Sequence, residues 1–218
     1  MQLQEMPSPN HDSRNGAAIT MLVLHYTGMT SAKAALDRLC DPAAKVSAHY
    51  TIDEDGTVYA HVPEDARAWH AGLSFWAGTR NVNACSIGIE LVNPGHEFGY
   101  HAFAGPQIAA LTELAQDIVK RHAIPASRVL GHSDVAPARK QDPGELFPWE
   151  DLARRGIGLW PKPAVTTAPA AALTRLGYDP DVTQEERILA FQRHFRPHHV
   201  SGAWDSESAG LLAGLLAL

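Results

Sequence analysis

The stretch ITMLVLHY, Ile19–Tyr26, is apolar almost without interruption until it reaches His25. Such a run is typical of a strand buried on both faces, because an exposed face would show a polar residue at every second position. A second stretch, CSIGIELV at Cys85–Val92, repeats this pattern and carries Glu90 near its end. Two such strands predict a sheet that lies inside the protein.

The segments around these two strands supply the other predicted elements. The turn residues Asp55 and Gly56 separate two short alternating segments and so predict a β-hairpin. The predicted helices are 31–39 and 105–122, and the further strands are 48–52, 57–61 and 128–131. This order predicts an α/β fold with a central mixed β-sheet flanked by helices. Residues 1–16 are polar and indicate a turn-rich arm.

The composition changes after residue 160. Residues 161–172 are rich in Pro, Ala and Thr, which indicates a linker. Helix-sized segments lie at 169–176, 183–195 and 206–216, and Thr183 with Glu186 forms a capping box at the start of the second. We therefore predict a domain at 1–160, a linker at 161–172 and a three-helix module at 173–218. Because roughly 45 residues is marginal for an independent core, this module is expected to dock on the first domain.

Charge and composition exclude some classes of function. The net charge of −6 argues against a nucleic-acid partner. Cys40 and Cys85 lie far apart, which disfavours a disulfide framework or a thiolate zinc site. No apolar run reaches the roughly 18 residues of a membrane span. No secretory signal is visible, so a cytoplasmic location is expected, with the cell envelope as the alternative.

Three side chains are candidates for a metal site. His25 ends a buried strand, His132 follows a short strand, and Asp142 precedes a Pro-Gly turn. Two imidazoles and a carboxylate with one open position are the ligand set of a hydrolytic zinc site. The chain has twelve histidines, however, and any one of them is more often a solvated or hydrogen-bonded side chain than a ligand. Asp142 could equally be a turn residue.

Two further charged residues accompany these candidates. Glu90 lies in a buried strand, where an unpaired carboxylate costs several kcal/mol, so it either pairs with a cation, lines a cavity or lies at the exposed end of the strand. A Glu with a raised pKa beside a metal would suit a general base. Lys140, two residues before Asp142, could stabilise an oxyanion or be a solvated loop lysine.

Four long blocks resemble the zinc-dependent N-acetylmuramoyl-L-alanine amidases of the amidase-2 superfamily, to which cytoplasmic anhydromuropeptide amidases and peptidoglycan-recognition proteins are related. The blocks are LVLHYTGM, VSAHYTIDEDGTVYAHVPEDARAWHAG, NVNACSIGIELVNPG and VLGHSDVAPARKQDPGELFPW, in this order over most of residues 19–160. Several long blocks together are far more specific than a short motif. The C-terminal segments LTRLGYDPD, ILAFQRHFRP and VSGAWDSESAGLLAGL resemble a peptidoglycan-binding helical module, with a helical buttress that touches no glycan as the alternative.

The resemblance implies a role for each residue. It implies that His25, His132 and Asp142 bind Zn²⁺, that Glu90 is the general base, and that Lys140 stabilises the tetrahedral oxyanion. It also places four residues in the substrate groove: His49, Trp69, His70 and Asn83. The chain departs from the pattern of many relatives at two positions. It has Ala48 where they carry a Tyr before the residue matching His49, which argues against a tyrosine-assisted mechanism. It has Asp142 where they use Cys as the third ligand, which places it in the carboxylate branch.

The implied reaction is hydrolysis of the amide between the lactyl group of N-acetylmuramic acid and L-alanine. The expected substrates are 1,6-anhydromuropeptides in cell-wall recycling. Three alternatives stay open at this point: an envelope amidase that cuts polymeric murein, a non-catalytic muropeptide-binding protein, and a zinc hydrolase for another amide. The retention of all three ligand residues favours an enzyme over a binding protein. Neither the oligomeric state nor the identity of the metal in vivo follows from the sequence.

Overall fold

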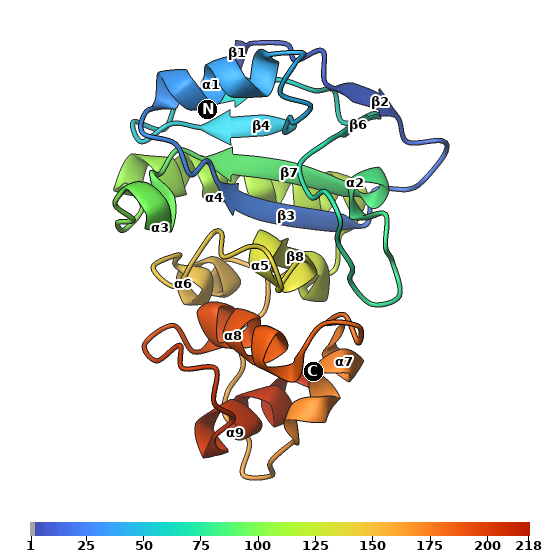
Figure 1. Ribbon diagram of the computed structural model, residues 1–218, viewed down its shortest axis with the longest axis vertical. Coiled ribbons are helices and arrows are strands. Elements are labelled where there is room, and N and C mark those ends of the chain that lie inside the picture. Colours follow the sequence, from blue (N-terminus) through green and yellow to red (C-terminus); the bar gives the residue numbers. More distant parts are fainter. Residues whose placement is uncertain (1–2) are drawn as a thin grey trace.

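A six-stranded sheet forms the centre of the protein, whose computed structural model describes residues 3–218 (Figure 1). Its strands lie side by side in the order β1-β5-β4-β7-β3-β8, and β2 pairs with β6 in a separate two-stranded sheet. The strands are β1 (Leu3–Glu5), β2 (His11–Ser13), β3 (Met21–Tyr26), β4 (Tyr50–Ile52), β5 (Val58–Ala60), β6 (Ala66–Ala68), β7 (Ser86–Leu91) and β8 (Val129–Gly131).

The large sheet is mixed, as the sequence predicted. Strands β4, β7, β3 and β8 are mutually parallel, whereas β5 runs antiparallel to β4 and completes the predicted hairpin. Gly56 in the hairpin turn has a φ of +89°, which glycine adopts without strain. The register pairs His25 on β3 with Glu90 on β7, so both side chains emerge on the same face.

Helices cover the sheet and its β8 edge (Figure 1). The helices are α1 (Ala32–Cys40), α2 (Val82–Cys85), α3 (Gly95–Phe98), α4 (Gly105–His122), α5 (His132–Val135), α6 (Trp149–Arg154), α7 (Leu173–Leu176), α8 (Gln184–Phe195) and α9 (Ser206–Leu215). The amphipathic helix α4 packs Leu111 and Ile118 against Leu22 and Ile87 of the two buried strands. The apolar residues that gave these strands their continuous pattern are thus divided between two opposite faces.

The C-terminal helices dock on the β8 side of the sheet, as expected (Figure 1). Met21 and Val23 of β3 share one apolar core with Leu173, Phe191 and Leu212. The predicted capping box is present, because Thr183 Oγ1 accepts from the backbone N–H of Glu186 and the Glu186 carboxylate accepts from Thr183. Residues from both predicted parts of the chain therefore form this half of the core.

The Pro/Ala-rich segment 161–172 packs along α9 instead of hanging free. Its backbone N–H groups at Ala164 and Ala168 donate to the carbonyls of Gly210 and Ala209. A Cβ atom added at Gly210 would lie 3.2 Å from the carbonyl oxygen of Ala164, so glycine permits this close approach. The division into 1–160, 161–172 and 173–218 remains a prediction about folding units.

The N-terminal segment, predicted as a polar, turn-rich arm, contributes a strand to each sheet within residues 3–16. Strand β1 extends the main sheet, β2 pairs with β6, and Arg14 is buried. The Arg14 guanidinium donates to the carbonyls of Glu64, Ala84 and Ser86, a long-range arrangement with no local sequence signal. The loop after β8 also contains the single helical turn α5, which is too short to show apolar periodicity.

No helix within residues 3–218 is both long enough and apolar enough to cross a lipid bilayer.

Candidate metal centre

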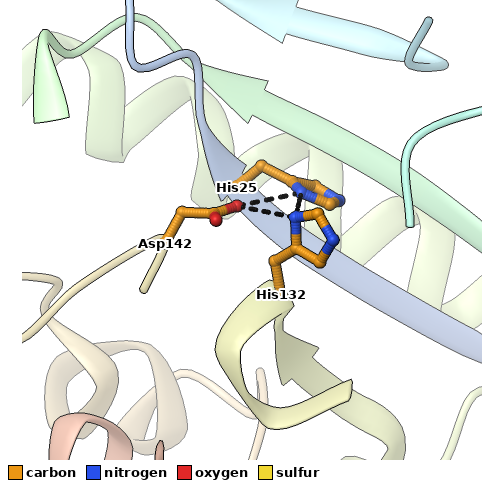
Figure 2. Close-up of side chains that lie close together, drawn as sticks. All are labelled: His25, His132 and Asp142. Carbon is orange, nitrogen blue, oxygen red and sulfur yellow. Dashed lines mark hydrogen bonds and ion pairs between the residues drawn. The ribbon is translucent and has the colours of Figure 1, made fainter. Parts of the chain in front are cut away.

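Three side chains from distant parts of the chain converge at one point (Figure 2). His25 Nδ1 lies 2.9 Å from His132 Nδ1, and Asp142 Oδ2 lies 3.1 Å from the first nitrogen and 3.0 Å from the second. All three residues are buried, and together they could hold a metal ion. The structure therefore brings together the three residues that the sequence singled out.

Parallel strands explain why these residues meet. His25 lies near the end of β3, and His132 begins α5 directly after β8, so both stand at the carboxyl ends of neighbouring parallel strands. Asp142 belongs to the loop that follows α5. The backbone N–H of Ser133 donates to the carbonyl of Asp142 over 2.8 Å, which closes the loop and holds its two ligands together.

A chain of hydrogen bonds sets the tautomer of His25. The Ser86 hydroxyl donates to the carbonyl of Val82 over 2.7 Å, so it accepts from His70 Nε2 at 3.1 Å. His70 Nδ1 then accepts from His25 Nε2 over 3.0 Å. His25 therefore carries its proton on Nε2 and presents an unprotonated Nδ1 to the cluster.

The second histidine is oriented in the same way. His132 Nε2 donates to the carbonyl of Ala71 over 3.1 Å, which leaves its Nδ1 unprotonated as well. Lone pairs on two nitrogens and one carboxylate oxygen then face one another about 3 Å apart. Such an arrangement is repulsive unless a cation lies between them. Bond lengths of about 2.0–2.1 Å in a tetrahedral zinc site separate ligand atoms by roughly 3.3 Å, so the residues fit this group.

Electrostatics keep His25 and Asp142 in the protonation states that bind a metal. Burial lowers the pKa of His25 to about 4, and repulsion from His132 adds to this effect. Burial alone would raise the pKa of Asp142, but the two histidines outweigh burial and hold the pKa of that carboxyl well below its ordinary value. At neutral pH the cluster thus offers a neutral His25 and an ionised Asp142, as metal binding requires.

Glu90 is the unpaired acid beside this cluster. Its Oε2 atom is buried and has no hydrogen-bond partner among residues 3–218. Burial, and then repulsion from Asp142, raise the pKa of Glu90 well above its ordinary value, while Lys140 opposes the shift. Glu90 also lines the cavity above the cluster, so it is neither a paired core residue nor a solvated strand end.

A cavity of about 390 Å³ opens over the cluster and is large enough for part of a small ligand. Among the predicted residues, His132 and Asp142 form its floor together with Glu90, and the wall includes Lys140, Trp69 and His70. His70 is buried, and its two ring nitrogens are engaged by His25 and Ser86. Three of the predicted residues, Trp69, Glu90 and Lys140, are half-buried and line the cavity.

The other two predicted groove residues do not reach the lining of this cavity within the described chain. His49 is fully buried, its Nδ1 accepts from the backbone N–H of Gly88, and its Nε2 lies 2.8 Å from the Arg14 guanidinium. Burial and the Arg14 charge lower the pKa of His49 to about 3. The Asn83 side-chain oxygen accepts from the backbone N–H groups of His70 and Ala71. These contacts support the segment that carries His70.

Sequence reasoning missed several residues that line the cavity. Tyr26 follows His25 directly, and its hydroxyl lies 2.9 Å from His96 Nδ1, whose ring stacks on Tyr100. Arg139 donates to the carbonyl of Ala71, the same oxygen that orients His132. The position of Tyr26 beside a candidate ligand was an available signal, whereas His96 and Arg139 come close only through the fold.

A buried His-His-Asp cluster at the carboxyl ends of parallel strands, with an unpaired carboxyl beside it, defines a candidate metal-dependent hydrolase of the α/β class. The sequence model of the amidase-2 family, N-acetylmuramoyl-L-alanine amidase, matches residues 15–145. The chain belongs to this amidase family, and the relatives that it matches are named as amidases, which are enzymes. It is 39% identical over 230 residues to the N-acetylmuramoyl-L-alanine amidase AmiD of Escherichia coli, covering 91% of this chain and 82% of AmiD.

Further relatives and solved structures that the chain resembles are also amidases of this family. The 1,6-anhydro-N-acetylmuramyl-L-alanine amidase AmpD of Enterobacter cloacae is 34% identical, covering 67% of this chain and 86% of AmpD. The structure of E. coli AmiD with anhydro-N-acetylmuramic acid-L-Ala-D-γ-Glu-L-Lys has a TM-score of 0.82 at 38% identity and covers 93% of this chain and 91% of AmiD. AmpDh3 of Pseudomonas aeruginosa, with an anhydromuramic pentapeptide, has a TM-score of 0.83 at 33% identity and covers 96% of this chain and 94% of AmpDh3.

Proposed function

We propose that this protein is a zinc-dependent amidase that hydrolyses the bond between the lactyl group of N-acetylmuramic acid and L-alanine in 1,6-anhydromuropeptides. The observation that carries the proposal is the convergence of three unprotonated ligand atoms beside Glu90, a half-buried carboxyl whose Oε2 is buried without a partner in the described chain. The solved complexes of AmiD and AmpDh3 with anhydromuropeptides support this choice of substrate.

The proposed ligands are His25, His132 and Asp142, and the proposed metal is zinc. When bound, zinc polarises the scissile carbonyl and lowers the pKa of water to near 7. Two imidazoles and a carboxylate form one of the ligand sets of catalytic zinc. Chelation should therefore abolish amidase activity, and added Zn²⁺ should restore it while Mg²⁺ does not. Full activity of protein that metal analysis shows to be free of zinc would contradict the proposal.

Glu90 is the proposed general base. Its carboxyl lies in the cavity floor on the strand next to His25, so it can take a proton from the attacking water and return it to the leaving amine of L-alanine. The raised pKa favours holding that proton between the two steps. A cation at the cluster would shift the balance of Glu90 towards the ionised form that accepts the proton.

Lys140 is the proposed oxyanion-stabilising group. It lines the cavity two residues before Asp142, and its ammonium has no hydrogen-bond partner in the described part of the chain. A positive charge placed there can stabilise the negative charge that develops on the carbonyl oxygen. Trp69 and His70 are proposed to border the bound muropeptide, and His49 and Asn83 to act on it only indirectly, through His70.

The most informative test compares hydrolysis of soluble anhydromuropeptides with hydrolysis of intact sacculi. Purified protein should release intact stem peptides that begin with L-alanine from soluble anhydromuropeptides, as detected by mass spectrometry. We expect slower release from intact sacculi under the same conditions. Faster release from sacculi would favour an envelope amidase, binding without release would favour a recognition protein, and cleavage within the stem peptide would indicate another amide hydrolase. The cytoplasmic location stays a separate prediction, which cell fractionation checks.

A further inference from the structure

Asp134 is a buried carboxylate that the proposed reaction does not use. It lies two residues after His132 within the helical turn α5. Three donors point to it. The backbone N–H of Gly131 donates to Oδ2 over 2.8 Å, His194 Nδ1 donates to the same oxygen over 2.7 Å, and the Tyr178 hydroxyl donates to Oδ1 over 2.6 Å. A buried carboxylate with this many partners is fixed in position.

Two of the three donors come from the C-terminal segment. Tyr178 follows α7 and is fully buried, and its ring packs edge-on against Trp76 at 5.0 Å. His194 lies in α8, and its ring stacks on Trp149 with a centroid distance of 3.8 Å. Trp149 begins α6 at the far end of the loop that carries Asp142. The C-terminal segment therefore holds this loop region at both α5 and α6.

The same carboxylate is connected to both loop ligands. Its bond to the N–H of Gly131 ties the end of β8 to α5, immediately before His132. The next residue, Ser133, donates its N–H to the carbonyl of Asp142. Gly131 also lies so close to the loop that a Cβ there would be 2.8 Å from Pro143 Cδ. A displacement of α5 would therefore move His132 and Asp142 together relative to His25 on β3.

We propose that Tyr178 and His194 are positioning residues that, through Asp134, hold two of the three ligands of the metal cluster in place. This inference rests on the proposed function, because it takes the cluster to bind zinc. It assigns the C-terminal segment a role in the metal site, distinct from any contact with glycan. Tyr178 and His194 are not among the residues that line the cavity, and their hydrogen bonds to Asp134 are what connects them to the ligands.

The first test compares two tyrosines in the full-length protein. Tyr178→Phe removes the hydroxyl that donates to Asp134. Tyr50→Phe is the matched control, because its hydroxyl donates over 2.8 Å to Glu64, and its ring packs against the opposite core, away from the cluster. Competition with a chelator measures the dissociation constant for Zn²⁺ at a temperature where both variants are folded. We expect an increase of about tenfold for Tyr178→Phe and no change for Tyr50→Phe.

The second test asks whether a side chain that restores the hydrogen bond from position 194 to Asp134 also restores the affinity for Zn²⁺. This test can be made even if Tyr178→Phe does not fold. His194→Leu and His194→Asn both lose the ring that stacks on Trp149, but only the asparagine amide can donate to Asp134 in place of Nδ1. Tighter binding of Zn²⁺ by His194→Asn than by His194→Leu supports the proposal. Equal affinities of the two variants would overturn it, as would an unchanged affinity in Tyr178→Phe or an equal loss in Tyr50→Phe.

Binding of Zn²⁺ by the wild-type protein separates this inference from the proposed function. If the wild type binds Zn²⁺ but cleaves no muropeptide, the proposed substrate is wrong and the comparison of affinities still stands. If the wild type cleaves muropeptides and Tyr178→Phe binds Zn²⁺ as tightly as the wild type, the amidase proposal survives and the positioning role fails.

Discussion

Glu90 has the most testable role of any single residue. Glu90→Gln keeps the shape of the side chain but removes its ability to accept a proton from water. We expect kcat to fall by about 10³-fold, within the range commonly found for general acid–base groups. The zinc content should stay unchanged, because Glu90 is not among the three clustered ligand atoms. Steady-state kinetics and metal analysis of the same preparation measure both quantities, and near-normal turnover would contradict the role.

Gly88 shows how a missing side chain shapes the site. A Cβ atom at this position of β7 would lie 2.6 Å from His70 Nδ1, the atom that accepts from His25. We expect Gly88→Ala to destabilise the fold by about 1–3 kcal/mol, as overpacking in a core does, and to weaken zinc binding. Denaturant unfolding and chelator competition measure the two effects. Gly105→Ala is the control, because a Cβ atom at Gly105 would meet no atom within 4 Å. Gly99→Ala is unsuitable, because the φ of +112° at Gly99 would strain an alanine. Wild-type behaviour of Gly88→Ala would refute this explanation.

At the scale of elements, Glu64 joins β4, the loop before β6 and the end of α4. Its carboxylate accepts hydrogen bonds from Tyr50, Arg121 and His122 over 2.8, 2.7 and 2.6 Å. Burial opposes ionisation, but these hydrogen bonds outweigh burial and lower the pKa of Glu64 to about 2. Because the folded pKa is depressed from its ordinary 4.5, this contribution to stability is complete above that pH.

Acidification should therefore remove the contribution of Glu64 as the pH falls from 4.5 towards 2. We expect Glu64 to contribute roughly 2 kcal/mol to the free energy of unfolding at neutral pH. Each pKa unit corresponds to about 1.4 kcal/mol, and the total is reduced because solvent screens the exposed side of Arg121. Glu64→Gln should be less stable than the wild type at pH 7, with a difference that shrinks through this window. Urea unfolding at a series of pH values measures it. A difference that does not change with pH would contradict this account.

The two predicted parts of the chain share one apolar core. Met21 and Val23 of the sheet pack against apolar side chains of α7, α8 and α9. We expect residues 1–160 alone to expose this face and to aggregate or unfold without cooperativity, because each large buried apolar side chain contributes roughly 1.5–3 kcal/mol. Size-exclusion chromatography and thermal unfolding test this expectation. A soluble, cooperatively folded 1–160 fragment would instead support two independent folding units.

Local chemistry explains why much of the fold was predictable. The continuous apolar runs of β3 and β7, the amphipathic pattern of α4 and the capping box of α8 all depend on residues close in sequence. Helix α4 spans Gly105–His122, the predicted range. Short elements such as α2, α3 and α5 were missed, because one helical turn carries no periodicity. Strands β1, β2 and β6 were missed as well, since pairing with distant strands stabilises three-residue segments that have no pattern of their own.

Residue types and their spacing are enough to pick out the side chains equipped for the proposed reaction: two histidines near predicted strand ends and an aspartate in a loop, together with Glu90 and Lys140. How these side chains are arranged depends on the fold. Only the fold fixes both histidine tautomers, through His70, Ser86 and Ala71, and only the fold leaves Oε2 of Glu90 buried without a partner in the described chain. It also buries His49 against Arg14 and joins the C-terminal segment to Asp134. The physical reason is that lone-pair direction, burial and charge depend on neighbours brought together from across the chain.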